Sequence, residues 1–260
     1  MKFSYIDEGK GKTIIFIHSY LWDKEMWRPQ IDFLKNDYRC ISIDLPAHGD
    51  SLSFTDEKNI SLKSLANEIV SFIETLKIDE YIYIGLSVGG MLAPYIYELD
   101  KEKVKKLIIM DSYVGNEPLE TKNLYFSMLD TIKSVGCIPQ PMAEKIAPIF
   151  FSPETFKNKT ELYNRFYNSL LNIETKNIDT IVRFGKEIFG RENILEKLKD
   201  ISIPTYFLTG EYDIPRPFYE AEKMSNLVKD SKIFKIKDAG HISNLENPDE
   251  VNKILKSILK

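Results

Sequence analysis

The sequence predicts an α/β fold: a mostly parallel, open, twisted sheet with helices on both faces and an inserted all-helical cap. Short apolar runs alternate with segments of helical periodicity along most of the chain. This alternation is typical of parallel strands that are joined by helices. It stops between about Gly115 and Lys197, where helical patterns occur without a convincing strand. We therefore expect a core formed by residues 1–114 and 198–260 and a cap formed by residues 115–197.

The predicted strands are short apolar runs that are too brief for helices. In chain order they are Thr13–His18, Tyr38–Asp44, Tyr81–Leu86, Val104–Met110, Thr205–Thr209 and Lys232–Ile236. Only Phe3–Asp7 is available for a strand before Thr13, so it stays open whether a first strand forms.

The predicted helices show apolar residues at a spacing of three or four. In the core they are Ser61–Leu76 with Ser61 as N-cap, Val88–Leu99, Pro217–Leu227 and Pro248–Leu259. In the cap they are Lys122–Val135, Pro141–Ile149, Pro153–Leu171 and Asn177–Phe189. Acidic and basic residues balance in residues 115–197, which favours an uncharged or small substrate.

Composition excludes several classes of protein. The chain has 260 residues, 43% hydrophobic and 28% charged, as expected of a globular domain. The formal net charge is −4 and the charges are interspersed, so no nucleic-acid interface is indicated. The longest apolar run, Ile14–Ile17, is far too short to cross a membrane, and the first residues lack the apolar centre of a signal peptide. We expect a cytoplasmic protein, monomeric or homodimeric, without membrane or nucleic-acid partners.

The strongest local motif is Gly85-Leu86-Ser87-Val88-Gly89, which follows a predicted strand and opens a predicted helix. A serine on such a tight turn projects its Oγ from the edge of the sheet, and small residues on either side leave room for the backbone. The helix that follows adds N–H donors and a positive dipole end, which favour a developing oxyanion. Ser87 is therefore the predicted nucleophile.

A serine nucleophile needs a base and an acid that orients the base. On this scaffold the chain order is serine, acid, histidine, and His241 is the only histidine after Ser87. Asp213 follows the Thr205–Thr209 strand and precedes His241 by 28 residues, room for one helix and one strand. Asp111 is the alternative acid, because it also ends a strand, whereas Glu211 is interpreted as a solvated carboxylate.

The oxyanion should be bound by two backbone N–H groups. One is that of Val88, directly after the nucleophile, and the other is expected from the loop His18-Ser19-Tyr20, at Tyr20. His18 itself is expected to brace this loop rather than to transfer a proton.

Five segments of the chain together resemble the α/β-hydrolase superfamily. They are HSYLWD (His18–Asp23), DLPAHGDS (Asp44–Ser51), GLSVGG (Gly85–Gly90), TGEYDIP (Thr209–Pro215) and AGHISNLENP (Ala239–Pro248). The resemblance implies an open sheet of usually eight strands with a helical cap, a triad of Ser87, Asp213 and His241, hole donors at Tyr20 and Val88, and hydrolysis without cofactor or metal. The chain departs from the family where Ser19 and Ala47 replace the usual glycines.

The residues near the nucleophile narrow the expected reaction within this superfamily. Its dehalogenases and epoxide hydrolases have an aspartate where this chain has Ser87. Carbon–carbon bond hydrolases usually place an aromatic residue after the histidine, where this chain has Ile242, and prolyl aminopeptidases carry a tryptophan at the position of Val88. GHISNLENP is most similar to enol-lactone hydrolases and small carboxylesterases. The prediction is therefore a serine hydrolase that cleaves a small-molecule carboxylic ester, lactone or thioester.

The cap should select the substrate. The predicted pocket residues are Ser19, Phe126, Phe150, Phe151 and Phe189, with Met128 and Phe166 as further candidates. A ligand receptor with a vestigial triad, a lyase, a perhydrolase and a carbon–carbon bond hydrolase remain as alternative functions.

Overall fold

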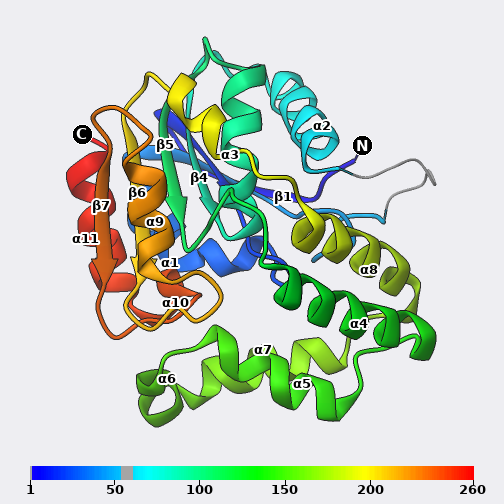
Figure 1. Ribbon diagram of the computed structural model, residues 1–260. Coiled ribbons are helices and arrows are strands. Elements are labelled where there is room, and N and C mark those ends of the chain that lie inside the picture. The colour runs from blue at the N-terminus through cyan, green and yellow to red at the C-terminus, as the bar shows by residue number, and fades with distance from the viewer. Residues whose placement is uncertain (1, 54–60) are drawn as a thin grey trace.

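The computed structural model describes residues 2–53 and 61–260 and contains a seven-stranded sheet (Figure 1). The strands are β1 Tyr5–Gly9, β2 Lys12–Ile17, β3 Tyr38–Ile43, β4 Tyr81–Leu86, β5 Val104–Met110, β6 Thr205–Gly210 and β7 Lys232–Ile236. Their order across the sheet is β1-β3-β2-β4-β5-β6-β7, and every neighbouring pair except β1 and β3 is parallel. The prediction of a mostly parallel α/β sheet is therefore confirmed.

A first strand does form, at the edge of the sheet. It begins at Tyr5, two residues later than the run available in the sequence, and pairs antiparallel with β3 so that Tyr5 lies opposite Ile43. Of the side chains of β1, only that of Ile6 is buried, because successive side chains point to opposite faces of the sheet. The resemblance implied eight strands, and the described part of the chain has seven.

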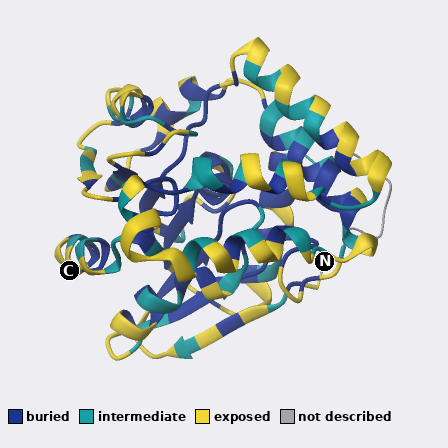
Figure 2. Cartoon of the chain, turned by 90° about the horizontal axis from the view of Figure 1, so that it is seen from below, coloured by how far each residue is buried: buried dark blue, intermediate teal, exposed yellow. Residues whose placement is uncertain are grey.

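Helices cover both faces of the sheet because the central strands are apolar on both sides. Buried residues of α2 Leu62–Thr75, α3 Val88–Leu99 and α9 Phe218–Ser225 join one hydrophobic cluster. The cluster on the other face contains buried residues of η1 Lys24–Trp27, α1 Arg28–Leu34 and α11 Pro248–Ile258. The short helix α10 Ser243–Glu246 precedes α11. In Figure 2 the strands are mainly buried, whereas the outer helices alternate between buried and exposed positions.

The insertion between β5 and β6 is helical throughout its regular structure. It contains α4 Leu119–Val135, α5 Gln140–Ile146, η2 Ala147–Phe150, α6 Pro153–Asn158, α7 Thr160–Leu171 and α8 Thr175–Gly190, and η3 Leu195–Asp200 leads back to the sheet. The single helix expected over Pro153–Leu171 is two helices, because Lys159 leaves the helical conformation at φ −135° and ψ 41°. Figure 1 shows α4 to α7 gathered at one end of the sheet, with α8 beside α4.

The carboxyl ends of the parallel strands point toward this helical insertion. The loops after β2, β4, β5, β6 and β7 therefore meet at one edge of the sheet, beneath the cap. No helix in the described ranges, 2–53 and 61–260, is long and apolar enough to span a membrane.

Candidate active site

Ser87 lies at the turn between β4 and α3 in a backbone conformation that few residues other than glycine adopt, with φ 55° and ψ −113°. Its N–H donates to the Met110 carbonyl at 2.9 Å, and the Ser112 hydroxyl donates to the Ser87 carbonyl at 2.7 Å. A Cβ at Gly85 would lie 2.3 Å from the backbone of Gly89, and one at Gly89 would lie 2.3 Å from a carbonyl of β2. The glycines therefore permit the close packing that fixes Ser87 in its turn.

The three predicted triad residues form one hydrogen-bonded chain. His241 Nε2 lies 2.9 Å from Ser87 Oγ, and His241 Nδ1 lies 3.0 Å from both carboxylate oxygens of Asp213. All three side chains are buried. Asp213 Oδ1 also accepts the N–H of Arg216 at 2.8 Å. This geometry suits an imidazole that removes a proton from Ser87 while Asp213 orients it.

Asp111, the alternative acid, makes no hydrogen bond to Ser87, His241 or Asp213 in the described structure. Its Oδ1 accepts the N–H of Gly210 at 2.8 Å and its Oδ2 accepts the Ser243 hydroxyl at 2.5 Å. Burial, followed by the nearby charge of Asp213, raises the pKa of the Asp111 carboxyl well above its usual range. Glu211, the other carboxylate considered, is exposed and accepts the N–H of Asp238 at 3.3 Å.

The loop after β2 presents the second predicted hole donor. Within the described residues, the N–H groups of Tyr20 and Val88 have no hydrogen-bond acceptor, which is compatible with their predicted role as oxyanion donors. The Tyr20 hydroxyl donates to the Ile181 carbonyl at 2.7 Å and so anchors this loop to α8. Leu21 has a positive φ of 67°, and its N–H donates to His48 Nε2 at 3.0 Å.

His18 braces this region, as the sequence predicted. It is fully buried, its Nε2 accepts the Leu45 N–H at 2.8 Å, and its Nδ1 lies 2.7 Å from the Ser19 carbonyl. Burial lowers its pKa, which favours the neutral ring that this bonding needs. No atom of the Ser87–His241–Asp213 chain is among the hydrogen-bond partners of His18 in the described structure.

The two departures from the family pattern have different structural consequences. Ser19 is buried at the cavity, where its hydroxyl lies 3.5 Å from the Tyr20 carbonyl and its N–H donates to the Met26 sulfur at 3.3 Å. Ala47 keeps the positive φ, 61°, that a glycine would adopt without cost. Ser19 thus adds a polar group beside the hole, whereas Ala47 adds only backbone strain.

A cavity of about 500 Å³ opens above Ser87, between the sheet edge and the cap. Ser19, Tyr20, Ser87 and His241 contribute to its wall, and most of the remaining wall is apolar. Of the aromatic residues predicted for the pocket, Phe150 and Phe189 line it, as does Met128. The Phe150 ring lies edge-on to His241, with ring centres 5.4 Å apart.

Phe126 and Phe151 are not part of the cavity wall, contrary to the prediction. Phe126 lies on the other side of α4, where the ammonium groups of Lys122 and Lys186 approach its ring. Phe151 follows η2 and is buried where the cap packs on the core, edge-on to Trp22. Phe166 also packs on Trp22, with parallel rings 4.8 Å apart, away from the main cavity. Sequence alone does not tell which face of a cap helix turns toward the substrate.

Glu246 is a buried residue of the site that the sequence analysis did not single out. Its Oε1 accepts the N–H of Gly240 at 2.8 Å, and its Oε2 accepts the Ser152 N–H at 2.7 Å and the Thr155 hydroxyl at 2.6 Å. The His241 N–H donates to the Phe150 carbonyl at 3.0 Å. Glu246 therefore ties the loop of the predicted base to the cap. Its place in GHISNLENP was the only signal of this role.

A buried ion cluster connects both ends of the cap to the core. Glu117, just before α4, accepts hydrogen bonds from Arg191, at the end of α8, and from Arg216, in the loop after β6. Arg216 also lies 3.6 Å from Glu220 on α9. Glu117, Arg191 and the pair Arg216 and Glu220 come from three distant segments of the sequence, so no local motif could have predicted the cluster.

Comparisons with known proteins identify the family of the chain. The sequence profile of the alpha/beta hydrolase fold matches residues 12–248. The chain is 24% identical to 3-oxoadipate enol-lactonase 1 of Acinetobacter baylyi, over 95% of this chain and 88% of that protein. A thermophilic esterase from Thermogutta terrifontis has a similar structure, with a TM-score of 0.90, 23% identity and coverage of 99% and 92% of the two chains. An enol-lactonase from Burkholderia xenovorans follows with a TM-score of 0.87, 17% identity and coverage of 99% and 96%. The chain belongs to the alpha/beta hydrolase fold family.

Proposed function

We propose that this protein is a serine hydrolase that cleaves a carboxylic ester, a lactone or a thioester through an acyl-enzyme on Ser87. The observation that carries the proposal is the hydrogen-bonded chain from Ser87 through His241 to Asp213 at the floor of a cavity. The same arrangement of nucleophile, base and orienting acid activates serine in unrelated hydrolases.

The geometry supports a two-step reaction. His241 Nε2 removes the proton from Ser87 Oγ as this oxygen attacks the substrate carbonyl, and Asp213 stabilises the imidazolium that forms. The N–H groups of Tyr20 and Val88 donate to the oxyanion. His241 then protonates the leaving alcohol or thiol, and a water molecule, deprotonated by His241, attacks the acyl-enzyme and releases the acid.

Some relatives bear names that describe ester chemistry, whereas others are named epoxide hydrolases. The names enol-lactonase and esterase both describe cleavage of an ester bond, and both belong to proteins similar to this chain. Identities of 17–24% support the reaction class without assigning a substrate. A monomeric or homodimeric state and a cytoplasmic location stay predictions from the sequence.

The proposal can be tested with a fluorophosphonate probe and a panel of p-nitrophenyl esters, lactones and thioesters. We expect the probe to label Ser87 and at least one substrate class to be hydrolysed. Ser87→Ala should abolish labelling and reduce kcat by at least about 10⁴-fold. Ser127→Ala is the matched control, because Ser127 is an exposed serine of α4 outside the cavity wall.

Other outcomes would support the alternative functions. If the wild type neither reacts with the probe nor hydrolyses any member of the panel, the proposal fails. Ligand binding that persists in Ser87→Ala without any labelling of the wild type would indicate a receptor. Labelling combined with peroxyacid formation or carbon–carbon cleavage, and without ester hydrolysis, would indicate another reaction at the same triad.

A further inference from the structure

The side chain of Tyr20 connects the loop after β2 to the cap. Its hydroxyl donates to the Ile181 carbonyl of α8 at 2.7 Å, and the residue is only 7% exposed. Burial raises the pKa of the Tyr20 hydroxyl, so this group stays protonated and able to donate. The same residue supplies one of the two N–H groups predicted to bind the oxyanion. The bond to Ile181 therefore links a cap helix to a predicted part of the reaction centre.

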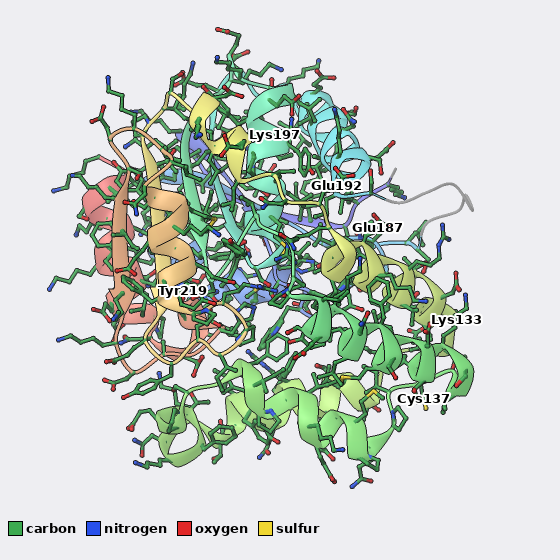
Figure 3. All side chains as sticks on the ribbon, viewed as in Figure 1. Lys133, Cys137, Glu187, Glu192, Lys197 and Tyr219 are labelled. Atoms are coloured by element: carbon green, nitrogen blue, oxygen red, sulfur yellow. The ribbon has the colours of Figure 1, made fainter. Side chains whose placement is uncertain are left out.

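Gly185 gives the Tyr20 hydroxyl access to α8. It lies one turn after Ile181, and a side chain at this position would point back toward the Ile181 carbonyl. A Cβ at Gly185 would lie 2.6 Å from the Tyr20 hydroxyl oxygen, too close for any side chain. Glycine otherwise weakens a helix interior by about 1 kcal/mol relative to alanine. We call the opening formed by Ile181 and Gly185 the α8 notch; Glu187, labelled in Figure 3, lies two residues further along this helix.

Aromatic contacts hold the ring of Tyr20 against the same helix. The ring lies edge-on to Phe184 and Phe189 of α8, with ring centres 5.9 and 6.1 Å away. On the core side, the ring centre of His48 lies 5.6 Å from that of Tyr20. Phe189 and Ile181 also line the main cavity. Helix α8 therefore contacts both the main cavity and the side chain of a predicted oxyanion donor.

The backbone on either side of Tyr20 is tied to the core rather than to the cap. The Ser19 N–H donates to the Met26 sulfur at 3.3 Å, and the Leu21 N–H donates to His48 at 3.0 Å. The Tyr20 N–H between them has no acceptor in the part of the chain that the structure describes. Core contacts thus hold the ends of this short segment, and the side chain that enters the α8 notch holds its middle.

We propose that Tyr20 is a positioning residue through which α8 completes the oxyanion hole: its hydroxyl, seated in the α8 notch, keeps the Tyr20 N–H directed at the oxyanion. The proposal rests on the proposed hydrolysis at Ser87. It gives the cap a role in the chemical step in addition to the expected selection of the substrate. Because the N–H binds charge that develops only after attack by Ser87, the effect belongs to kcat rather than to KM.

Tyr20→Phe tests the role of the hydroxyl, because it keeps the ring. On the p-nitrophenyl ester that the wild type hydrolyses fastest, we expect kcat to fall about ten-fold, less than the roughly 10²–10³-fold loss of a complete oxyanion donor. KM should stay within about two-fold, since the substrate carries no oxyanion before attack. Inhibition by 2,2,2-trifluoroacetophenone, whose adduct with Ser87 carries an oxyanion, should weaken by the same factor as kcat. A merely structural effect would change KM and the melting temperature instead.

Gly185→Ala tests the α8 notch from the side of the helix. The added Cβ should displace the Tyr20 hydroxyl and lower kcat at least as much as Tyr20→Phe does, although alanine by itself favours the helix. In Tyr20→Phe/Gly185→Ala the hydroxyl oxygen is absent, so the double variant should be no slower than Tyr20→Phe. Gly190→Ala is the matched control on the same helix, because its Cβ would contact the ring of Phe126 outside the cavity wall, and it should leave kcat unchanged.

A second neighbour of Gly185 provides the alternative explanation that this design can detect. The added Cβ would also lie 2.9 Å from the side chain of Leu129 on α4. If Leu129→Ala restores kcat in Gly185→Ala and Tyr20→Phe does not, the glycine serves the packing of α4 on α8 and the proposal is overturned. Losses that multiply in Tyr20→Phe/Gly185→Ala would overturn it as well, because the two residues would then act independently.

The outcomes also separate this proposal from that of ester hydrolysis. An active wild type whose kcat and inhibition by the ketone stay the same in Tyr20→Phe would refute the positioning role and leave the hydrolase intact. A wild type that neither hydrolyses the esters nor reacts with fluorophosphonate would refute the hydrolase, and the positioning role with it.

Discussion

At the scale of single residues, Asp111 joins the two loops that carry the proposed acid and base. It accepts the N–H of Gly210, which precedes the Asp213 loop, and the hydroxyl of Ser243, which follows His241. Because burial and the charge of Asp213 raise its pKa, the neutral carboxyl is the favoured form. Protonation of Oδ2 reverses the bond to Ser243, so that the neutral carboxyl, like an asparagine side chain, accepts at one atom and donates at the other.

Asp111→Asn should therefore be tolerated and Asp111→Ala should not. We expect the asparagine variant to unfold with a free energy within about 1 kcal/mol of the wild type, since the Ser243 hydroxyl can reverse and accept. The alanine variant should lose about 2–4 kcal/mol and part of its kcat, because two buried polar groups lose their partner. Urea unfolding and steady-state kinetics measure both. Equal destabilisation by the two substitutions would contradict a neutral Asp111.

His48 supports the oxyanion loop in a way that depends on its protonation state. Its Nε2 accepts the Leu21 N–H, and its Nδ1 lies 2.8 Å from the Pro46 carbonyl, an arrangement that fits a neutral ring with its proton on Nδ1. Burial, helped by the neighbouring His18, lowers the pKa of His48 to about 3. An unfolded chain would protonate the same residue near its ordinary pKa of about 6.5.

This difference predicts a loss of stability in acid. Between about pH 6.5 and about 3 the unfolded state binds a proton at His48 that the folded state does not bind. His48 should therefore reduce the free energy of unfolding by up to about 1.4 kcal/mol for each pH unit in this window. His48→Gln, which keeps an acceptor for Leu21 and cannot be protonated, should show a shallower dependence in urea unfolding at several pH values. Identical slopes in the two proteins would rule out this role.

At the scale of elements, the loop of the proposed base and the cap are held together by Glu246 and by the contact between His241 and Phe150. Both oxygens of Glu246 accept hydrogen bonds from N–H groups, one of Gly240 and one of Ser152. An amide side chain in this place can accept at only one end. Movement of the segment from η2 to α6 should consequently displace His241.

Glu246→Gln is expected to weaken this connection without altering the volume of the side chain. The N–H group of either Gly240 or Ser152 would then face the N–H₂ group of the new glutamine. We expect the free energy of unfolding to fall by about 1–3 kcal/mol and the labelling of Ser87 to become roughly ten-fold slower. Glu211→Gln serves as the control, because Glu211 is exposed and accepts a neighbouring N–H. Labelling kinetics with a fluorophosphonate compare the variants. An unchanged rate in Glu246→Gln would show that His241 does not need this support.

The elements differ in how far the sequence could predict them. The central strands were predicted closely because their runs are apolar on both faces. Ser87 could be proposed because it directly follows β4, Asp213 because it lies in the loop after β6, and His241 because it is the only histidine after Ser87. The split of the cap helix at Lys159 had no glycine or proline to mark it. Only some of the aromatic residues predicted for the pocket line the cavity. The sequence could not select among them in α4, because this helix carries apolar residues on more than one face. The Glu117 cluster depends on contacts between distant segments, which periodicity does not reveal.

At the scale of the whole molecule, cap and core share one hydrophobic interior. Ile132, Phe166 and Leu170 of the cap belong to the same buried cluster as Phe16 and Trp27 beneath the sheet. The ion cluster around Glu117 adds polar contacts at both ends of the insertion. A cap that is packed in this way should unfold together with the sheet.

The two tryptophans allow this cooperativity to be measured, because each reports on a different part of the molecule. Trp22 stacks on Phe166 of the cap. Trp27 is fully buried, and the centre of its ring lies 5.1 Å from that of Phe16 in β2. We expect Trp27→Phe, which leaves Trp22, and Trp22→Phe, which leaves Trp27, each to show one urea transition in fluorescence. Each transition should coincide with the loss of helical circular dichroism measured on the same variant. If the Trp22 signal changes at a lower urea concentration than the circular dichroism of its own variant, the cap detaches before the sheet unfolds and the shared interior is not a single cooperative unit.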